Sequence, residues 1–295
     1  MIDPHRLAAL VAVHRTGSVS AAAAELHYGQ PTISHHLRRL EAETGSVLLQ
    51  RVGRGIRLTD DGVRLARRGE EILGLLARAD EELAAATSLQ AGRVRLAAFP
   101  SAAATVVPAA VSLLCAEAPG LTLELVEAEP PQAAELLRRG TVDLALTFGY
   151  DDRGPDEPDG LESEPLVHDP LMLVVSDAAP RRRGGDRLRD HADSRWVTGC
   201  ERCRSELVAL CADAGFEPAI GFASDDYVAV QALVASGFGV SILPALALRA
   251  HRHAGVRTTA LPAARTVRLS TYGRPPRPAA VEAVADVVRR AARRM

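Results

Sequence analysis

Residues 18–41 constrain the fold of this chain more tightly than any other stretch. Ser18 precedes a run of alanines, whose small side chains allow another helix to pack closely. Gly29 marks a turn, and Pro31 suits the first turn of the helix that follows. That second helix carries apolar residues at spacings of four and three: Ile33, Leu37 and Leu40. The pattern therefore predicts two short helices joined by a tight turn, with the second resting one face on a core.

The other face of the second helix is polar. It carries hydrogen-bonding side chains on both sides of Pro31: Gln30, Thr32, Ser34, His35 and Arg38. In a helix-turn-helix the second helix enters the DNA major groove, where Arg and Gln can bond base edges and Ser and Thr more often contact phosphates. We therefore predict that these residues, with Pro31, bind DNA; the alternative is a face that is only solvated. His35 and His36 lie about 100° apart on a helix, so we expect His35 to be the one that faces DNA.

A short hairpin is predicted after this helix, at residues 51–59, with glycine near its tip. Three arginines lie on it: Arg51, Arg54 and Arg57. A narrow minor groove attracts inserted arginine, so the hairpin is interpreted as a DNA-contacting wing with Arg54 foremost. The alternative is that one of the three pairs with Glu41 or Glu43.

Charge is divided unevenly along the chain. Residues 1–67 hold nine arginines against six acidic residues, whereas residues 68–295 hold 26 arginines against 31 acidic residues. All basic side chains except histidine are arginine, a planar bidentate donor. A basic end on an otherwise acidic protein suits a module that contacts DNA.

One long helix is predicted from about residue 60 to residue 89. Apolar residues recur in it at alternating spacings of four and three: Ile72, Leu76, Ala79, Leu83 and Ala86. This heptad pattern favours pairing with the same helix of a second chain. The alternative is a helix that lies on its own domain.

Beyond residue 92 the pattern alternates between strands and helices. Expected strands are 93–99, 121–127 and 142–148, and expected helices are 102–116 and 131–139. Such alternation predicts parallel strands covered by helices on both faces. Residues 151–160 are predicted as a loop, followed by strands at 171–175, 195–198, 219–223 and 240–243 and helices near 203–214 and 226–236.

The N-terminal motifs together resemble those of LysR-type transcriptional regulators. The resemblance is specific at residues 17–22, 26, 30–34, 37–41, 45, 48, 51 and 58–62, and weaker at 140–146, 214–218 and 233–244. Gly29 stands where the family usually has serine, which removes a possible phosphate contact, and Leu49 stands where phenylalanine is common.

The resemblance implies an α/β protein with three parts: a winged helix-turn-helix at 1–62, a linker helix at 63–91, and a two-lobed effector domain at 92–295 like that of periplasmic binding proteins. Lobe I would take about 92–165 and 266–295, and lobe II about 166–265. It further implies a homodimer or homotetramer that binds double-stranded promoter DNA, responds to a small-molecule effector and acts on RNA polymerase.

An effector site is predicted beyond the carboxyl ends of the strands, where ligands bind in open α/β sheets. The candidate residues are Phe99, Ser101, Ala102, Thr147, Phe148, Thr198, Gly199, Cys200, Asp225 and Tyr227. Ser101 opens a helix, whose free N–H groups favour an anion, and Phe99 and Phe148 suggest a small, partly apolar one. The alternative for Ser101 is a simple helix cap.

Four cysteines are too few to cross-link a chain of this length. Cys200 and Cys203 form a C-x-x-C pattern at a predicted helix start, beside Arg202 and Arg204, which can lower a thiol pKa. A thiol-based redox sensor is therefore the alternative function. A zinc site would need two more ligands at suitable spacing, and only Cys211 and distant histidines are available, so we expect no metal.

Catalysis has little support in the sequence. No Ser-His-Asp order, His-Glu-x-x-His motif or paired carboxylates stand out, so we expect neither an enzyme nor a cofactor. The apolar runs are short or interrupted by charge, and the first residues lack the features of a signal peptide. We therefore expect a cytoplasmic regulator without a membrane span.

Overall fold

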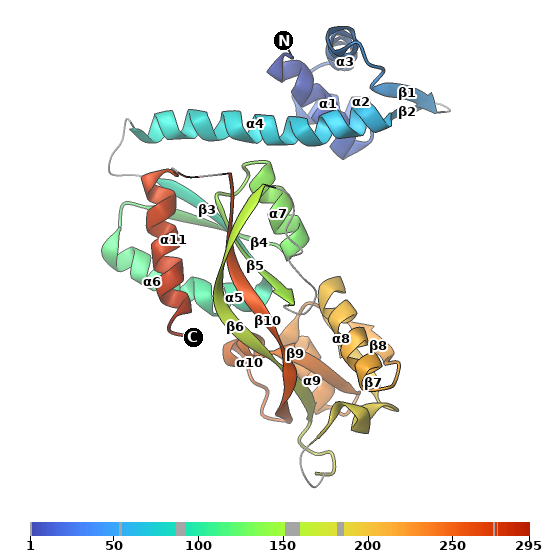
Figure 1. Cartoon of the computed structure of the whole chain (residues 1–295), viewed down its shortest axis with the longest axis vertical. Helices are drawn as coiled ribbons and strands as arrows, with labels where there is room; N and C mark the ends of the chain where they lie inside the picture. Colours follow the sequence, from blue (N-terminus) through green and yellow to red (C-terminus); the bar gives the residue numbers. More distant parts are fainter. Residues whose placement is uncertain are drawn as a thin grey trace. The chain divides into compact units, whose positions relative to one another are not determined.

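A computed structural model of the chain describes residues 2–52, 55–86, 92–150, 160–181, 186–273, 275 and 277–295. The chain divides into two compact units. The first comprises Met1–Leu89 with Arg138–Thr141, and the second comprises Gln90–Leu137 with Val142–Met295 (Figure 1). Each unit has its own apolar core.

Three helices open the first unit: α1 (Pro4–Thr16), α2 (Val19–Glu25) and α3 (Gln30–Thr44). Gly17 ends α1 in the left-handed region at φ 68°, and the Ser18 side chain then accepts from the backbone N–H of Ala21 to cap α2. Gly45 ends α3 in the same conformation, at φ 65°. These local signals explain why the predicted helices are confirmed. The predicted turn between α2 and α3 is present as well, with His27 as its left-handed residue at φ 56°.

A two-stranded hairpin follows, formed by β1 (Leu49–Val52) and β2 (Gly55–Leu58) in antiparallel register. Glu41 on α3 holds its start, because one carboxylate oxygen accepts from the backbone N–H of Leu48 at 2.8 Å and of Leu49 at 3.1 Å. Thr59 ends the hairpin and caps the next helix, since its hydroxyl accepts from the N–H of Gly62 at 3.0 Å. The predicted wing fold is therefore present.

The long helix α4 spans Asp60–Ala86. Its middle carries three exposed apolar side chains within little more than one helical turn: Ile72, Leu75 and Leu76. Two of these belong to the predicted heptad, and Ala79 of the same heptad is also exposed. The side chains of Leu83 and Ala86 lie outside the described part of the chain.

The second unit is built on one mixed sheet in the order β4-β3-β5-β10-β6-β9-β7-β8. Its strands are β3 (Arg93–Ala98), β4 (Thr122–Glu127), β5 (Leu144–Tyr150), β6 (Leu161–Ser176), β7 (Arg195–Thr198), β8 (Ala219–Ala223), β9 (Val240–Pro244) and β10 (Val256–Tyr272). Strands β4, β3 and β5 are parallel, which confirms the predicted unit, and β7 is parallel to both β8 and β9. The long antiparallel strands β6 and β10 cross between these two halves (Figure 1).

Helices cover both faces of this sheet. They are α5 (Pro100–Ala103), α6 (Val106–Glu117), α7 (Pro130–Arg138), α8 (Glu201–Asp213), α9 (Tyr227–Ala235), α10 (Ala245–Ala250), α11 (Ala279–Ala292) and a short 3-10 helix, η2 (Leu188–His191). The single helix predicted at 102–116 is wrong. It is broken before Val106, where the Thr105 hydroxyl donates to the Ser101 carbonyl at 2.6 Å.

One described stretch, Pro100–Glu117, is long and apolar enough in composition to cross a membrane, and the bent pair α1–α2 passes the same test as one broken span. The stretch contains the break between α5 and α6. Its buried residues belong to the core of the second unit: Ser101, Ala102, Val106, Val107, Ala110 and Leu114. Core packing therefore accounts for its composition.

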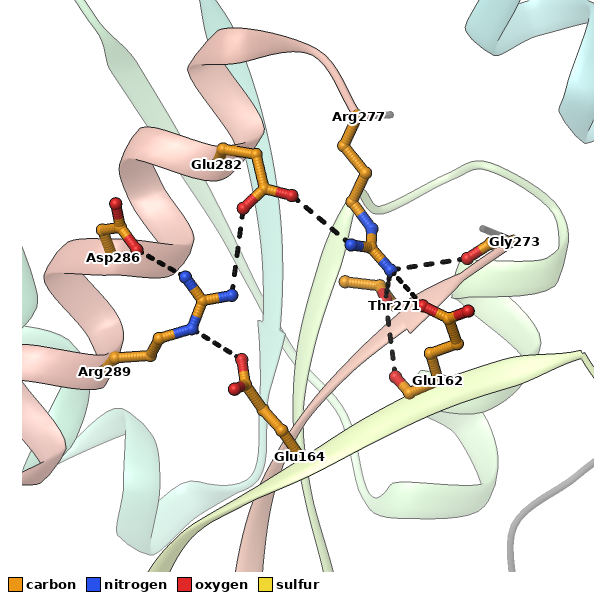
Figure 2. Close-up of polar contacts among 8 residues, drawn as sticks. All are labelled: Glu162, Glu164, Thr271, Gly273, Arg277, Glu282, Asp286 and Arg289. Carbon is orange, nitrogen blue, oxygen red and sulfur yellow. Dashed lines mark hydrogen bonds and ion pairs between the residues drawn. The ribbon is translucent and has the colours of Figure 1, made fainter. Parts of the chain in front are cut away.

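Helix α11, which the sequence pattern did not predict, is fastened to the sheet by charged groups (Figure 2). Arg277 precedes it and donates to Glu162 of β6 and to the Thr271 hydroxyl of β10, both at 2.7 Å. One turn from its end, Arg289 donates to Glu164 of β6 at 2.7 Å. These contacts join α11 and the segment before it to β6 and β10.

Candidate DNA-reading surface and effector cavity

Helix α3 separates its two faces cleanly. Ile33, Leu37 and Leu40 are buried in the core of the first unit. The predicted DNA-binding side chains lie on the accessible side, with Ser34 partly covered and the others exposed: Gln30, Pro31, Thr32, Ser34, His35 and Arg38. The arrangement exposes hydrogen-bonding side chains along one face of a helix that is about the width of a major groove.

The two histidines of α3 occupy different surroundings. His36 is half-buried, with its ring centroid 5.8 Å from that of Tyr28, whereas His35 is exposed. Arg38 lies one turn after Ser34, and its Nε donates to the Ser34 carbonyl at 3.3 Å. His36 therefore packs against Tyr28 of the turn, and His35 lies on the polar face.

On the hairpin, Arg57 of β2 is exposed. Arg54 and the side chain of Arg51 lie outside the described residues. The two carboxylates considered as partners for these arginines have other contacts: Glu43 forms an ion pair with Arg6, and Glu41 accepts from the backbone at the hairpin start. Neither the ion pair of Glu43 nor the backbone contact of Glu41 involves Arg57.

The second unit contains a cavity of about 530 Å³. Its lining is Glu129, Pro131, Gln132, Tyr150, Cys200, Glu201, Arg202, Ser205, Glu206 and Asp225. Glu129, Cys200 and Asp225 each lie two residues beyond the end of a parallel strand, namely β4, β7 and β8. Tyr150 is the last residue of β5. The carboxyl ends of strands from both halves of the sheet therefore build this cavity, as is usual for ligand sites in open α/β folds.

Most of the charged side chains in the cavity wall are acidic. Four carboxylates face one guanidinium, that of Arg202. Burial raises the pKa of the Glu129 carboxyl, and the nearby charges of Asp225 and Glu127 raise it further. This wall therefore favours a neutral or positively charged group over an anion.

Behind the cavity lies a buried charged cluster centred on Arg265 of β10. Its Nε donates to Asp169 of β6 at 2.9 Å, and its Nη2 donates to the Ser101 hydroxyl at 2.7 Å. The guanidinium carbon lies 4.8 Å from the ring centroid of Phe99 and 4.4 Å from that of Phe148. Arg265 is only 2 % exposed. A guanidinium of this chain therefore occupies the position in front of Ser101 where the sequence predicts an anionic effector.

Cys200 and Asp225 are the two predicted effector residues that line the cavity. Ser101, Phe99, Phe148 and Ala102 belong to the buried layer around Arg265 and the core. The remaining predicted residues do not line the cavity. The Thr147 hydroxyl lies 2.8 Å from that of Ser270, and Thr198 is buried. Gly199 precedes α8, and half-buried Tyr227 opens α9.

Sequence analysis missed Glu129, Tyr150 and Arg265. The rule that ligand sites follow strand ends would have selected Glu129 had it been applied to β4. On β5 the same rule gave Thr147 and Phe148, because the strand was predicted to end at 148, whereas it extends to Tyr150. Arg265 carries no such local signal, because its partners lie 96 and 164 residues away in the sequence.

Among the residues that the structure describes, no group of three or more His, Cys, Asp or Glu side chains could hold a metal ion.

Two family models match the chain. The "Bacterial regulatory helix-turn-helix protein, lysR family" matches residues 4–63, and the "LysR substrate binding domain" matches residues 87–293. The chain belongs to the LysR family of transcriptional regulators. In this family a helix-turn-helix DNA-binding domain precedes an effector-binding domain, so the polar face of α3 and the cavity fall in the parts of the chain that carry these two functions.

Relatives and solved structures agree with this assignment. The HTH-type transcriptional regulator TfdS of Cupriavidus pinatubonensis is 31% identical over 287 residues, which cover 95% of each chain. The crystal structure of CbnR, a LysR family transcriptional regulator, matches with a TM-score of 0.65 at 24% identity and covers 98% of this chain and 99% of that one. Full-length CbnR complexed with its target DNA matches with a TM-score of 0.63 at 23% identity over 98% of this chain and 99% of that one. The predicted fold class is thereby confirmed.

Proposed function

We propose that this LysR-type regulator reads promoter DNA in the cytoplasm with α3 and the β1–β2 hairpin. The observation that carries the proposal is the division of α3 into a buried apolar face and an exposed polar face. The proposed contacts are Gln30, Pro31, Thr32, Ser34, His35 and Arg38 on the helix, and Arg51, Arg54 and Arg57 on the hairpin. Arg38 and Gln30 would read base edges, whereas the hydroxyls would position the helix on phosphates.

Two copies of the chain would bring two such heads to one duplex. The exposed apolar residues of α4 support pairing through this helix: Ile72, Leu75 and Leu76. A continuous apolar row with charged neighbours is the pattern of a coiled-coil seam. We therefore propose a homodimer, or a homotetramer of such pairs, that recruits RNA polymerase at the promoter.

The effector would bind in the 530 Å³ cavity between the two halves of the α/β unit. The excess of carboxylates places a neutral or cationic group of the effector against Glu129 and Asp225. An anionic effector, as expected from the sequence, is the less favoured alternative, because Arg265 is neutralised by Asp169 and covered by Phe99 and Phe148. Of the predicted set, Cys200 and Asp225 would touch the ligand directly, and Ser101 would act by holding Arg265.

Regulation would follow from an equilibrium between two assemblies that space their DNA-reading heads differently. An effector shifts such an equilibrium only by its difference in affinity for the two states. The working division of the chain is a DNA-binding domain at 1–62, a linker helix at 63–91 and an effector domain at 92–295, with lobe I at about 92–165 and 266–295 and lobe II at about 166–265.

Selection of genomic fragments by the purified full chain tests the DNA-binding proposal. We expect wild-type protein to enrich a small set of fragments upstream of genes, and Gln30→Ala and Arg38→Ala variants to lose that enrichment. Thermal unfolding of each variant controls for folding. Enrichment of the same fragments by both variants would place the reading surface elsewhere.

A filled cavity tests the effector proposal separately. Ser205 lines the cavity and Val208 lies one turn further along α8, outside that lining. Ser205→Trp should abolish the response of a reporter gene, driven by a selected promoter fragment, to changes in growth condition, while fragment binding persists. Val208→Trp is the matched control and should respond as wild type. An unaltered response of Ser205→Trp contradicts the assignment of the cavity.

A further inference from the structure

The start of α8 brings two thiols together at the wall of the cavity. Cys200 is the N-cap residue of α8 and lines the cavity, and Cys203 lies in the first turn of the same helix. The Cys200 thiol donates to the Cys203 sulfur with a separation of 3.0 Å between the two Sγ atoms. Both cysteines are free, so the separation is a contact between two reduced side chains.

Their surroundings make the two sulfurs chemically different. The hydrogen bond from Cys200, together with the charge of Arg265 and a hydrogen bond from Tyr150, lowers the pKa of the Cys203 thiol. The same hydrogen bond and burial raise the pKa of Cys200. A thiol of lowered pKa in the first turn of a helix is the arrangement of a nucleophilic cysteine, and the neighbour with the proton is placed to resolve it.

The other two cysteines lack this arrangement. Cys211 is fully buried further along α8, where burial raises its pKa to about 11. Cys115 lies exposed on α6. They provide matched controls within the same chain.

We propose that Cys200 and Cys203 form a reversible intrachain disulfide at the effector cavity when a hydroperoxide oxidises this pair. The Cys203 thiolate attacks the terminal peroxide oxygen and the O–O bond breaks, so Cys203 becomes a sulfenic acid. The other oxygen takes up a proton and leaves as the alcohol, or as water when the oxidant is hydrogen peroxide. The Cys200 sulfur then attacks the Cys203 sulfur, and the S–O bond breaks. The oxygen departs as water with the proton of Cys200. In total two thiols lose two electrons and the peroxide gains them.

The consequence for the cavity follows from the position of the pair. Glu201, Arg202 and Ser205 line the cavity from the same first turns of α8 that the disulfide would constrain. Oxidation therefore changes the wall that the effector contacts, and this last step rests on the proposed function of the cavity. Formation of the disulfide does not rest on it.

The experiment uses the purified full chain, reduced and then exposed to hydrogen peroxide. Trypsin cleaves after Arg202, so Cys200 and Cys203 fall in different peptides, 196–202 and 203–204, which only a disulfide can keep joined. We expect this linked pair in the non-reducing digest, a loss of two of the four free thiols, and full recovery with dithiothreitol. The measurement needs no DNA and no effector, so it can fail or succeed independently of the proposed function.

Variants and alternative linkages complete the test. Cys115→Ser and Cys211→Ser should still form the linked peptides, whereas Cys200→Ser and Cys203→Ser should form none. Recovery of all four thiols after peroxide treatment of the wild-type chain would overturn the proposal. So would a linkage through Cys115 or Cys211, or irreversible oxidation of Cys203 without linked peptides.

Discussion

Replacing Asp169 with alanine would leave a guanidinium buried without its carboxylate. Arg265 is 2 % exposed and would retain the Ser101 hydroxyl and two ring faces, but it would lose the oxygen 2.9 Å from its Nε. Removing one partner of a buried ion pair costs about 3–5 kcal/mol. The backbone N–H of Leu246 would also lose its acceptor, which lies 2.9 Å away on the same carboxylate, at a cost of about 1–3 kcal/mol.

Differential scanning calorimetry of the full chain at neutral pH measures the effect. For a domain of about 150–250 residues, each kcal/mol lowers the melting temperature by roughly 2–4 °C, so a combined loss of at least about 4 kcal/mol predicts a fall of at least roughly 8–16 °C in the transition of the α/β unit. The double variant Asp169→Ala/Arg265→Met removes the unpaired charge and should be more stable than Asp169→Ala alone. The reasoning is refuted if the single variant melts within about 2 °C of wild type, or if the double variant is the less stable of the two.

Two further perturbations follow from the structure. Gly62→Ala should destabilise the first unit by about 1–3 kcal/mol in chemical denaturation, because its β-carbon would overlap the carbonyl oxygen of Leu48. The control Gly29→Ala, whose β-carbon would meet nothing closer than 3.6 Å, should be nearly neutral, and equal losses would contradict the packing argument. Burial and the charge of Asp225 raise the pKa of the Glu129 carboxyl, so its neutral form is favoured in the folded chain. The protonated carboxyl therefore stabilises the folded state below the pKa of Glu129 in the unfolded chain, and this stabilisation is lost as pH rises through the raised pKa. The melting temperature of Glu129→Gln should therefore fall less steeply with rising pH than that of wild type. Parallel curves of melting temperature against pH for the two proteins would refute the assignment.

Local signals in the sequence were sufficient for the DNA-binding unit. The caps at Ser18 and Thr59 and the left-handed glycines Gly17 and Gly45 each act within a few residues, so the helix ends they define could be predicted directly from the sequence. The strand ends that carry Cys200 and Asp225 were predicted on the same basis, since short parallel strands have continuous apolar runs.

The central strands and the buried ion pair of the α/β unit could not be predicted from local signals in the sequence. Strand β10 was missed because its register shifts between Ala260 and Ala264, around Pro262, which interrupts the alternation expected of a strand. The ion pair of Arg265 with Asp169 depends on that register, since the two residues are partners across β10 and β6. A buried guanidinium in front of Ser101, and the acidic cavity beyond it, therefore emerge only from the folded sheet.

The central claim is that the polar face of α3 reads base sequence. The most direct measurement is the ratio of affinities of the full chain for a selected promoter fragment and for a scrambled fragment of equal length, titrated at one salt concentration. We predict that Arg38→Ala lowers this ratio by about 5- to 150-fold, which corresponds to about 1–3 kcal/mol of base discrimination. Arg181→Ala, which removes a guanidinium that is 78% exposed in the other unit, should leave the ratio unchanged. An Arg38→Ala chain that discriminates between the two fragments as well as wild type would contradict the account.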